Sequence, residues 1–92
     1  MGKIERVNIT SVQELYNLVS DRSVRGFFGA ITCSGEDTSG EDNSATFYNG
    51  YLSWDNLYEM TIHGPASTGV DYLYLDRRES THEASGYIYI YS

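Results

Sequence analysis

Hydrophobic and polar residues alternate along much of this chain with the two-residue period of a β-strand. Residues 87–91 read YIYIY, which places Ile88 and Ile90 on one face and the tyrosines on the other. Residues 57–63 and 70–76 alternate in the same way. Three further segments are rich in β-branched and aromatic residues, as strands are: residues 3–9, 24–33 and 45–54.

Residues near the N-terminus follow the helical period instead. Ser11 and Glu14 form an S-x-x-E capping box, in which each side chain can accept a hydrogen bond from a backbone N–H of the first turn. Apolar residues then recur at the spacing of one helical face: Val12, Leu15, Tyr16 and Val19. The pattern predicts a helix over residues 12–20.

The dipeptide Asn49-Gly50 lies between two pairs of aromatic or apolar residues and predicts a two-residue β-hairpin. Both central residues of a type I′ turn need a positive φ, which Asn and Gly adopt most readily. Farther along, a helix through residues 54–58 competes with the strand predicted over residues 57–63.

The connections predicted between these segments are short. Their signals are turns at Asp55-Asn56, Gly64-Pro65 and Thr68-Gly69, and a single helical turn that Ser80 and Glu83 could open. Hairpin-length connections join antiparallel strands, whereas parallel strands need a long crossover. The predicted fold is therefore α+β and one domain over residues 1–92, with one N-terminal helix packed on a twisted antiparallel sheet of five or six short strands.

Charge is distributed unevenly along the 92 residues, whose net charge is −7. Residues 26–76 contain no Lys or Arg. The same block holds eight carboxylates: Glu36, Asp37, Glu41, Asp42, Asp55, Glu59, Asp71 and Asp76. Such a block attracts basic surfaces and repels nucleic acid and anionic membranes, so neither is an expected direct partner.

The segment SGEDTSGEDNS, residues 34–44, repeats itself and admits three interpretations. As a calcium loop it would need ligands at alternating positions, but its acids come in adjacent pairs whose side chains diverge in an extended chain. As a hairpin tip it has suitable turn residues and charges that keep a loop soluble. As a mobile acidic arm it would bind a basic groove of a partner. The second and third interpretations are compatible, because a flexible hairpin tip could also make that contact.

Tyrosine is the dominant aromatic residue, with nine tyrosines against three phenylalanines. Tyrosine suits half-exposed positions in a sheet, and it is also enriched at protein interfaces, where it supplies contact area at low entropic cost. Beside carboxylates it can bind Arg and Lys by cation–π contact. Tyr48 and Tyr51, on either side of the predicted turn, are the candidate central anchors of a binding surface.

The sequence gives little support for an enzyme. His63 and His82 lie in different predicted elements, and Cys33 follows an apolar run that favours burial. No nucleophile-elbow, phosphate-loop or zinc-ligand spacing occurs, so no catalytic residue, metal or cofactor is expected. The lone cysteine fits a reducing cytosol, and no apolar stretch approaches the ~18 residues of a membrane span, so a cytoplasmic location is expected.

In size, in its Lys/Arg-free block from Gly26 to Asp76 and in its carboxylates, the chain resembles small phage-encoded inhibitors of bacterial defence. These are the anti-CRISPR and DNA-mimic anti-restriction proteins. The resemblance implies a non-enzymatic inhibitor whose carboxylates stand where phosphates normally bind, on the basic surface of a nucleic-acid-binding protein. The eight carboxylates, with Tyr48 and Tyr51, are then the expected partner-binding residues.

Other interpretations remain open at this point. The two ends of the chain resemble barstar, a nuclease inhibitor, but residues 24–76 read as hairpins where barstar-like proteins are largely helical. A ligand-binding or structural phage module with a tyrosine-rich sheet face is the alternative from a different class. The tyrosine strand 87–91 could also pair edge to edge with a second copy to form a homodimer.

Overall fold

The computed structural model describes residues 3–22 and 26–91, in which the chain forms one helix and a curled antiparallel sheet of seven strands. The elements are β1 (Ile4–Ile9), α1 (Val12–Arg22), β2 (Phe28–Glu36), β3 (Asp42–Tyr48), β4 (Tyr51–Trp54), β5 (Glu59–His63), β6 (Tyr72–Asp76) and β7 (Glu83–Tyr91). The expected α+β class is confirmed, with one strand more than the upper expectation. Within the described residues, no helix is both long and apolar enough to cross a bilayer.

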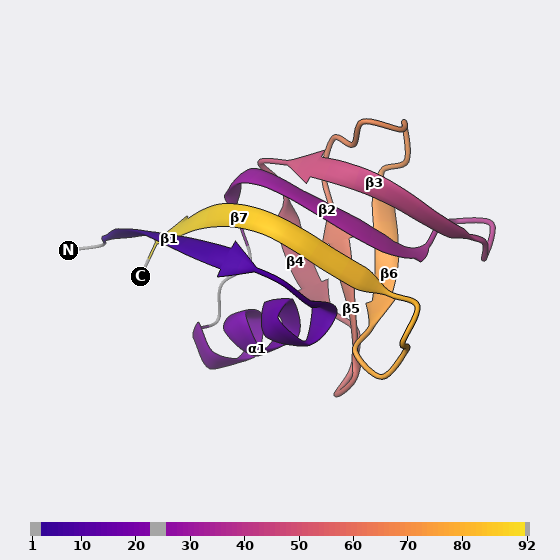
Figure 1. The fold of residues 1–92 in the computed structure, drawn as a ribbon, viewed down its shortest axis with the longest axis horizontal. Coiled ribbons are helices and arrows are strands. Elements are labelled where there is room, and N and C mark those ends of the chain that lie inside the picture. The colour runs from indigo at the N-terminus through magenta and orange to yellow at the C-terminus, as the bar shows by residue number, and fades with distance from the viewer. Residues whose placement is uncertain (1–2, 23–25, 92) are drawn as a thin grey trace.

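The strands form two layers (Figure 1), and β2 of the first layer also pairs with β6 of the second. β1, β7, β2 and β3 run side by side, and β4, β5 and β6 run steeply across them. The two groups join where the last residue of β2, Glu36, pairs with Tyr74 of β6. Because β2 is nine residues long and pairs with β7, β3 and β6, it is the strand around which the sheet curls.

The core lies between the two layers. Ile88 and Ile90 of β7 are buried, as are Leu73 and Leu75 of β6, which confirms the alternation predicted for both strands. The helix closes one open end of the core. Its Tyr16 donates a hydrogen bond to the Leu57 carbonyl at 2.5 Å.

The helix begins where its cap predicts. The Ser11 hydroxyl accepts a hydrogen bond from the Glu14 N–H at 3.1 Å. The Glu14 carboxylate accepts from the backbone N–H and the hydroxyl of Thr10 rather than from Ser11, and these bonds lower the Glu14 pKa. The predicted helix is confirmed, although it continues two residues beyond residue 20.

The hairpin predicted at Asn49-Gly50 is wrong. β3 pairs with β2, and β4 pairs with β5, so the dipeptide is a corner that passes the chain from one layer to the other. Asn49 has the expected positive φ of 54°, but Gly50 does not have a positive φ. Gly50 is required for a different reason, since a Cβ there would lie 1.9 Å from the His63 carbonyl oxygen.

Several smaller expectations are also corrected. Only residues 37–41 of the acidic repeat lie outside strands, because Glu36 and Asp42 pair across the β2–β3 hairpin. Glu83 opens a strand rather than following a helical turn. The competing helix through residues 54–58 does not form, because residue 54 ends a strand, residues 56–58 are a bend and residues 59–63 form the next strand. β7 lies between β1 and β2, so strand 87–91 has no free edge for the homodimer pairing that its sequence left open. Val24 and Arg25, predicted to begin a strand, lie outside the described residues.

Candidate functional site

One surface of the protein is formed by the outer side chains of β4, β5 and β6. The inward residues of these strands, such as Leu52, Met60 and Ile62, are buried, and the alternate residues lie on the opposite side of the sheet. Of those, Thr61 is also buried, at 4% exposure, and the others are half-buried or exposed. The outward residues form three rows across the strands: Tyr51, His63 and Tyr72; Ser53, Thr61 and Tyr74; Asp55, Glu59 and Asp76. We call these nine residues the acidic–aromatic face.

The first row is a set of aromatic rings in contact. Tyr51 and His63 stack with ring centroids 4.4 Å apart and planes 4° apart, and Tyr72 lies 6.0 Å from His63. The ring of Tyr74 meets that of Tyr72 edge to face at 5.8 Å. The Ser53 hydroxyl, 2.8 Å from His63 Nε2, fixes the orientation of the imidazole. These contacts hold the rings in fixed positions on the surface.

The third row carries three carboxylates. Glu59 and Asp76 are direct cross-strand partners, and Asp55 precedes them in the turn after β4. The Asp55 carboxylate accepts a hydrogen bond from the Thr61 hydroxyl at 2.6 Å, which holds it against the same face. Like charges directly opposite one another destabilise a sheet, and Arg78 offsets this effect here because it binds Asp76.

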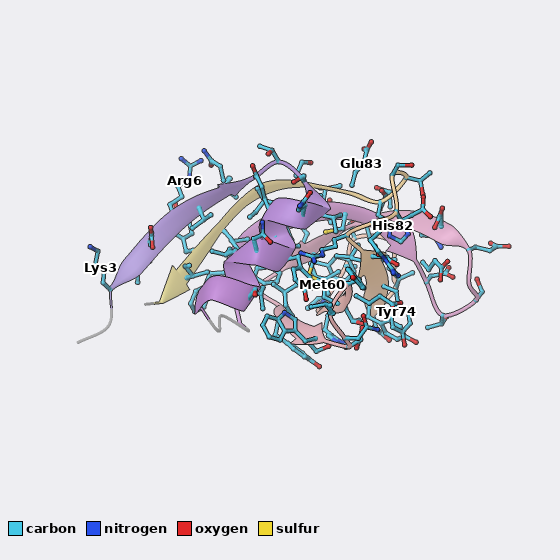
Figure 2. All side chains as sticks on the ribbon, turned by 90° about the horizontal axis from the view of Figure 1, so that it is seen from below. Lys3, Arg6, Met60, Tyr74, His82 and Glu83 are labelled. Atoms are coloured by element: carbon cyan, nitrogen blue, oxygen red, sulfur yellow. The ribbon has the colours of Figure 1, made fainter. Side chains whose placement is uncertain are left out.

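A pocket of about 110 Å³ opens beside this row. It is lined by Glu36, Glu59, Tyr74, Asp76, Glu79 and His82, and we call it the acidic pocket. Its carboxylates come from β2, β5, β6 and the turn that precedes β7. Figure 2 shows Tyr74 and His82 toward one end of the long axis of the molecule, with Lys3 and Arg6 at the other. The fold therefore gathers acids that lie far apart in the sequence.

Two basic residues, Arg78 and His82, form hydrogen bonds with Asp76 at the acidic pocket. The Arg78 guanidinium binds Asp76 through two hydrogen bonds, of 3.0 Å and 2.7 Å, and lowers the pKa of that carboxyl to about 2. His82 accepts the Asp76 backbone N–H at its Nδ1, 2.9 Å away, and its Nε2 lies 3.6 Å from Asp42. Asp76 is thus already paired. Glu36, by contrast, makes no side-chain hydrogen bond or ion pair within the described residues.

Stability in acid should depend on Asp76. Its pKa is about 2 in the folded protein and about 3.9 in an unfolded chain, so its contribution is present above pH ~4 and is lost as the pH falls through 2. Solvent screening limits that contribution to about 1 kcal/mol or less. We expect Asp76→Asn to destabilise the protein at pH 7 but much less at pH 2, as measured by urea unfolding at both values. An equal effect at both pH values would contradict the ion pair.

The remaining predicted binding residues are not all on this surface. Asp37 turns inward and accepts hydrogen bonds from Ser39, Glu41 and Asn43, of which the Ser39 hydroxyl bond lowers its pKa most. Its role is to shape the hairpin tip. Glu41 and Asp42 are exposed near that tip.

The two anchor tyrosines are separated by the fold. Tyr51 belongs to the acidic–aromatic face, whereas Tyr48 lies on β3, opposite Ala30 of β2. Asp71 precedes β6, at the end of that strand away from Asp76. The predicted set is therefore brought together only in part, as Glu36, Tyr51, Asp55, Glu59 and Asp76, with Asp42 at the margin of the pocket beside His82.

Several site residues were missed by sequence reasoning, namely His63, Tyr72, Tyr74, Glu79 and His82. A usable signal exists for three of them, because the period of residues 57–63 places His63 on the same face as Glu59, and the period of residues 70–76 places Tyr72 and Tyr74 on the same face as Asp76. No local pattern indicates that the turn carrying Glu79 and His82 folds back toward β2. That approach depends on the pairing of β2 with both β6 and β7.

Covalent and metal chemistry are not apparent in the described part of the chain. Burial raises the pKa of the Cys33 thiol to about 12, so this residue is not a thiolate nucleophile at neutral pH. Within residues 3–22 and 26–91, no three His, Cys, Asp or Glu side chains are placed to hold a metal ion. Comparison with known protein families, curated proteins and solved structures finds no match.

Proposed function

We propose that this protein is an acidic inhibitor that binds the basic, nucleic-acid-binding surface of a defence or nuclease protein in the cytoplasm of a host cell. Its carboxylates would occupy the positions that phosphates otherwise take. The observation that supports this proposal is the convergence of Glu36, Glu59, Asp76 and Glu79 on one pocket. A surface of this sign speeds association with a basic partner and discriminates against acidic ones.

The arrangement of like charges adds to this support. Glu36 lies directly opposite Asp42, and Glu59 lies directly opposite Asp76. Arg78 already offsets the second pair because it binds Asp76, so the Glu36–Asp42 pair is the one whose repulsion a basic partner would relieve on binding. Acids placed only for solubility would be expected at separated positions with both signs interspersed.

The test is capture on the immobilised protein from a bacterial lysate, followed by assay of the captured protein. We expect the captured protein to be released by raised salt, because exposed charges are screened beyond ~8–10 Å near physiological ionic strength. We also expect one equivalent of the inhibitor to block its binding to nucleic acid.

The matched variants remove the same number of charges in two places. Glu36→Gln/Glu59→Gln/Glu79→Gln, in the acidic pocket, should weaken binding at least tenfold, or by about 1.4 kcal/mol. Glu41→Gln/Asp71→Asn/Glu83→Gln, outside the pocket, should have a much smaller effect. Equal losses for both variants would show that net charge alone is responsible, and no loss for either would refute the proposal.

A second candidate is supported by the outer surface of the other layer. Phe28, Tyr48, Tyr87 and Tyr89 are exposed there, and Tyr87 and Tyr89 meet edge to face at 5.9 Å. Such a surface suits a ligand-binding or structural module. Binding through it would be nearly indifferent to salt and would survive both sets of charge substitutions.

A further inference from the structure

Arginine side chains within this protein stack on its tyrosine rings. Each arginine whose side chain is described lies over a tyrosine ring: Arg6 over Tyr87 at 4.4 Å, Arg77 over Tyr16 at 4.7 Å and Arg78 over Tyr58 at 4.3 Å. Arg78 also binds Asp76 through two nitrogens. A guanidinium that stacks on a ring while it pairs with a carboxylate is thus an arrangement this surface already makes.

The acidic pocket has the parts to make the same arrangement with a guest. Tyr74 supplies a ring that is 44% exposed, and Glu36, Glu59 and Glu79 supply carboxylates that no basic side chain in the described residues pairs with. Asp76 is already bound to Arg78, and one oxygen each of Glu59 and Glu79 accepts a hydrogen bond, from Asn56 and Thr81 respectively. Glu36 and the second oxygens of Glu59 and Glu79 are therefore the acceptors left for a partner. The volume of about 110 Å³ is suited to one guanidinium head and part of its stem.

The chemistry favours arginine over lysine. A guanidinium is planar, stacks on aromatic rings and presents a fork of N–H donors that matches carboxylate geometry, and it is less strongly hydrated than an ammonium. A lysine would keep the charge interactions with the ring and the carboxylates, but it lacks the planar group that stacks on a ring and pairs with a carboxylate through two N–H donors. The rings of Tyr72, His63 and Tyr51 continue from Tyr74 across the face and offer further stacking positions.

We propose that the acidic pocket and the adjoining aromatic row bind arginine side chains of the partner in preference to lysine. This inference rests on the proposed function and specifies the partner surface as an arginine-rich one. The pocket receives one guanidinium between Tyr74 and the carboxylates of Glu36 and Glu59. Neighbouring arginines of the partner stack along the row toward Tyr51.

The test uses two fluorescent peptides of equal length and charge, nona-arginine and nona-lysine, titrated with the protein at low salt. We expect the arginine peptide to bind about fivefold more tightly or better, since an exposed cation–π contact contributes a factor of about two to five. Tyr74→Leu should reduce this preference to under about twofold, because the arginine peptide loses more affinity than the lysine peptide does. Tyr74→Phe, which keeps the ring, should retain the preference and shows whether a fold defect explains the leucine variant.

Tyr48→Leu is the matched control, because Tyr48 is exposed to a similar extent, 47%, on the other layer. Its preference should equal that of the unmodified protein. Equal, salt-sensitive binding of both peptides would overturn the arginine inference and leave the proposed function standing. Binding of neither peptide would overturn both. A preference that survives Tyr74→Leu, or that Tyr48→Leu removes, would overturn the assignment to this pocket.

Discussion

Replacing Gly35 by alanine is expected to lower the free energy of unfolding by about 3 kcal/mol, the upper part of the range for an overpacked interior. A Cβ at this position would lie 2.3 Å from the backbone oxygen of Tyr74 and 2.8 Å from a methyl carbon of Leu75. The oxygen belongs to a paired strand and cannot move without shifting β6. Since Gly35 precedes Glu36, the shift would also displace Glu36 from the acidic pocket.

Urea unfolding of Gly35→Ala measures this effect, and Gly26→Ala is its control. A Cβ at Gly26 would have its nearest neighbour 4.0 Å away, so that variant should unfold at nearly the same urea concentration as the unmodified protein. The two substitutions add the same methyl group at different places. If Gly35→Ala is as stable as Gly26→Ala, the close approach of β2 to β6 is not as described.

Phe47→Ala is expected to lower the free energy of unfolding by about 3–5 kcal/mol. The Phe47 side chain is fully buried, at 0% exposure, and it lies between Ile31 of β2 and the bridge to Ala66. A domain of this length has only about 5–14 kcal/mol of total stability. The variant should therefore be partly unfolded at 37 °C, which circular dichroism and thermal unfolding would show.

The neighbouring residue provides the control for this substitution. Tyr48 follows Phe47 on the same strand but faces outward, so Tyr48→Ala should change the free energy of unfolding by only about 0.5 kcal/mol. A small effect of Phe47→Ala, similar to that of Tyr48→Ala, would contradict the inward orientation of the Phe47 side chain.

The elements of this fold that depend on local pattern could be predicted. The alternation of Leu73 and Leu75 with tyrosines, and of Ile88 and Ile90 with tyrosines, is a property of neighbouring residues and is seen in the structure. The helix start at Ser11 is equally local, because its cap needs only the first turn. The turn at Asp55-Asn56 was also predicted, and the Asn56 side chain accepts the backbone N–H of Tyr58 and of Glu59 there.

Strand pairing was predicted less well. Asn49-Gly50 has the composition of a hairpin turn, but the composition of a turn does not determine which strand each flanking segment will pair with. β3 gains a seven-residue pairing with β2, so the chain turns a corner instead. The Ser80–Glu83 signal failed for a similar reason, since pairing of β7 with both β1 and β2 outweighs a single capped turn.

The sequence by itself determined the acidity of this protein, its single short helix and the face on which most strand residues lie, because each follows from composition or from neighbours within one turn or one strand. Only the tertiary structure decided which acids meet. Glu36, Glu59, Asp76 and Glu79 are up to 43 positions apart, and they converge because the long strand β2 pairs with three others and curls the sheet. Contacts between residues so distant depend on the packing of the whole chain, which no short stretch of residues encodes.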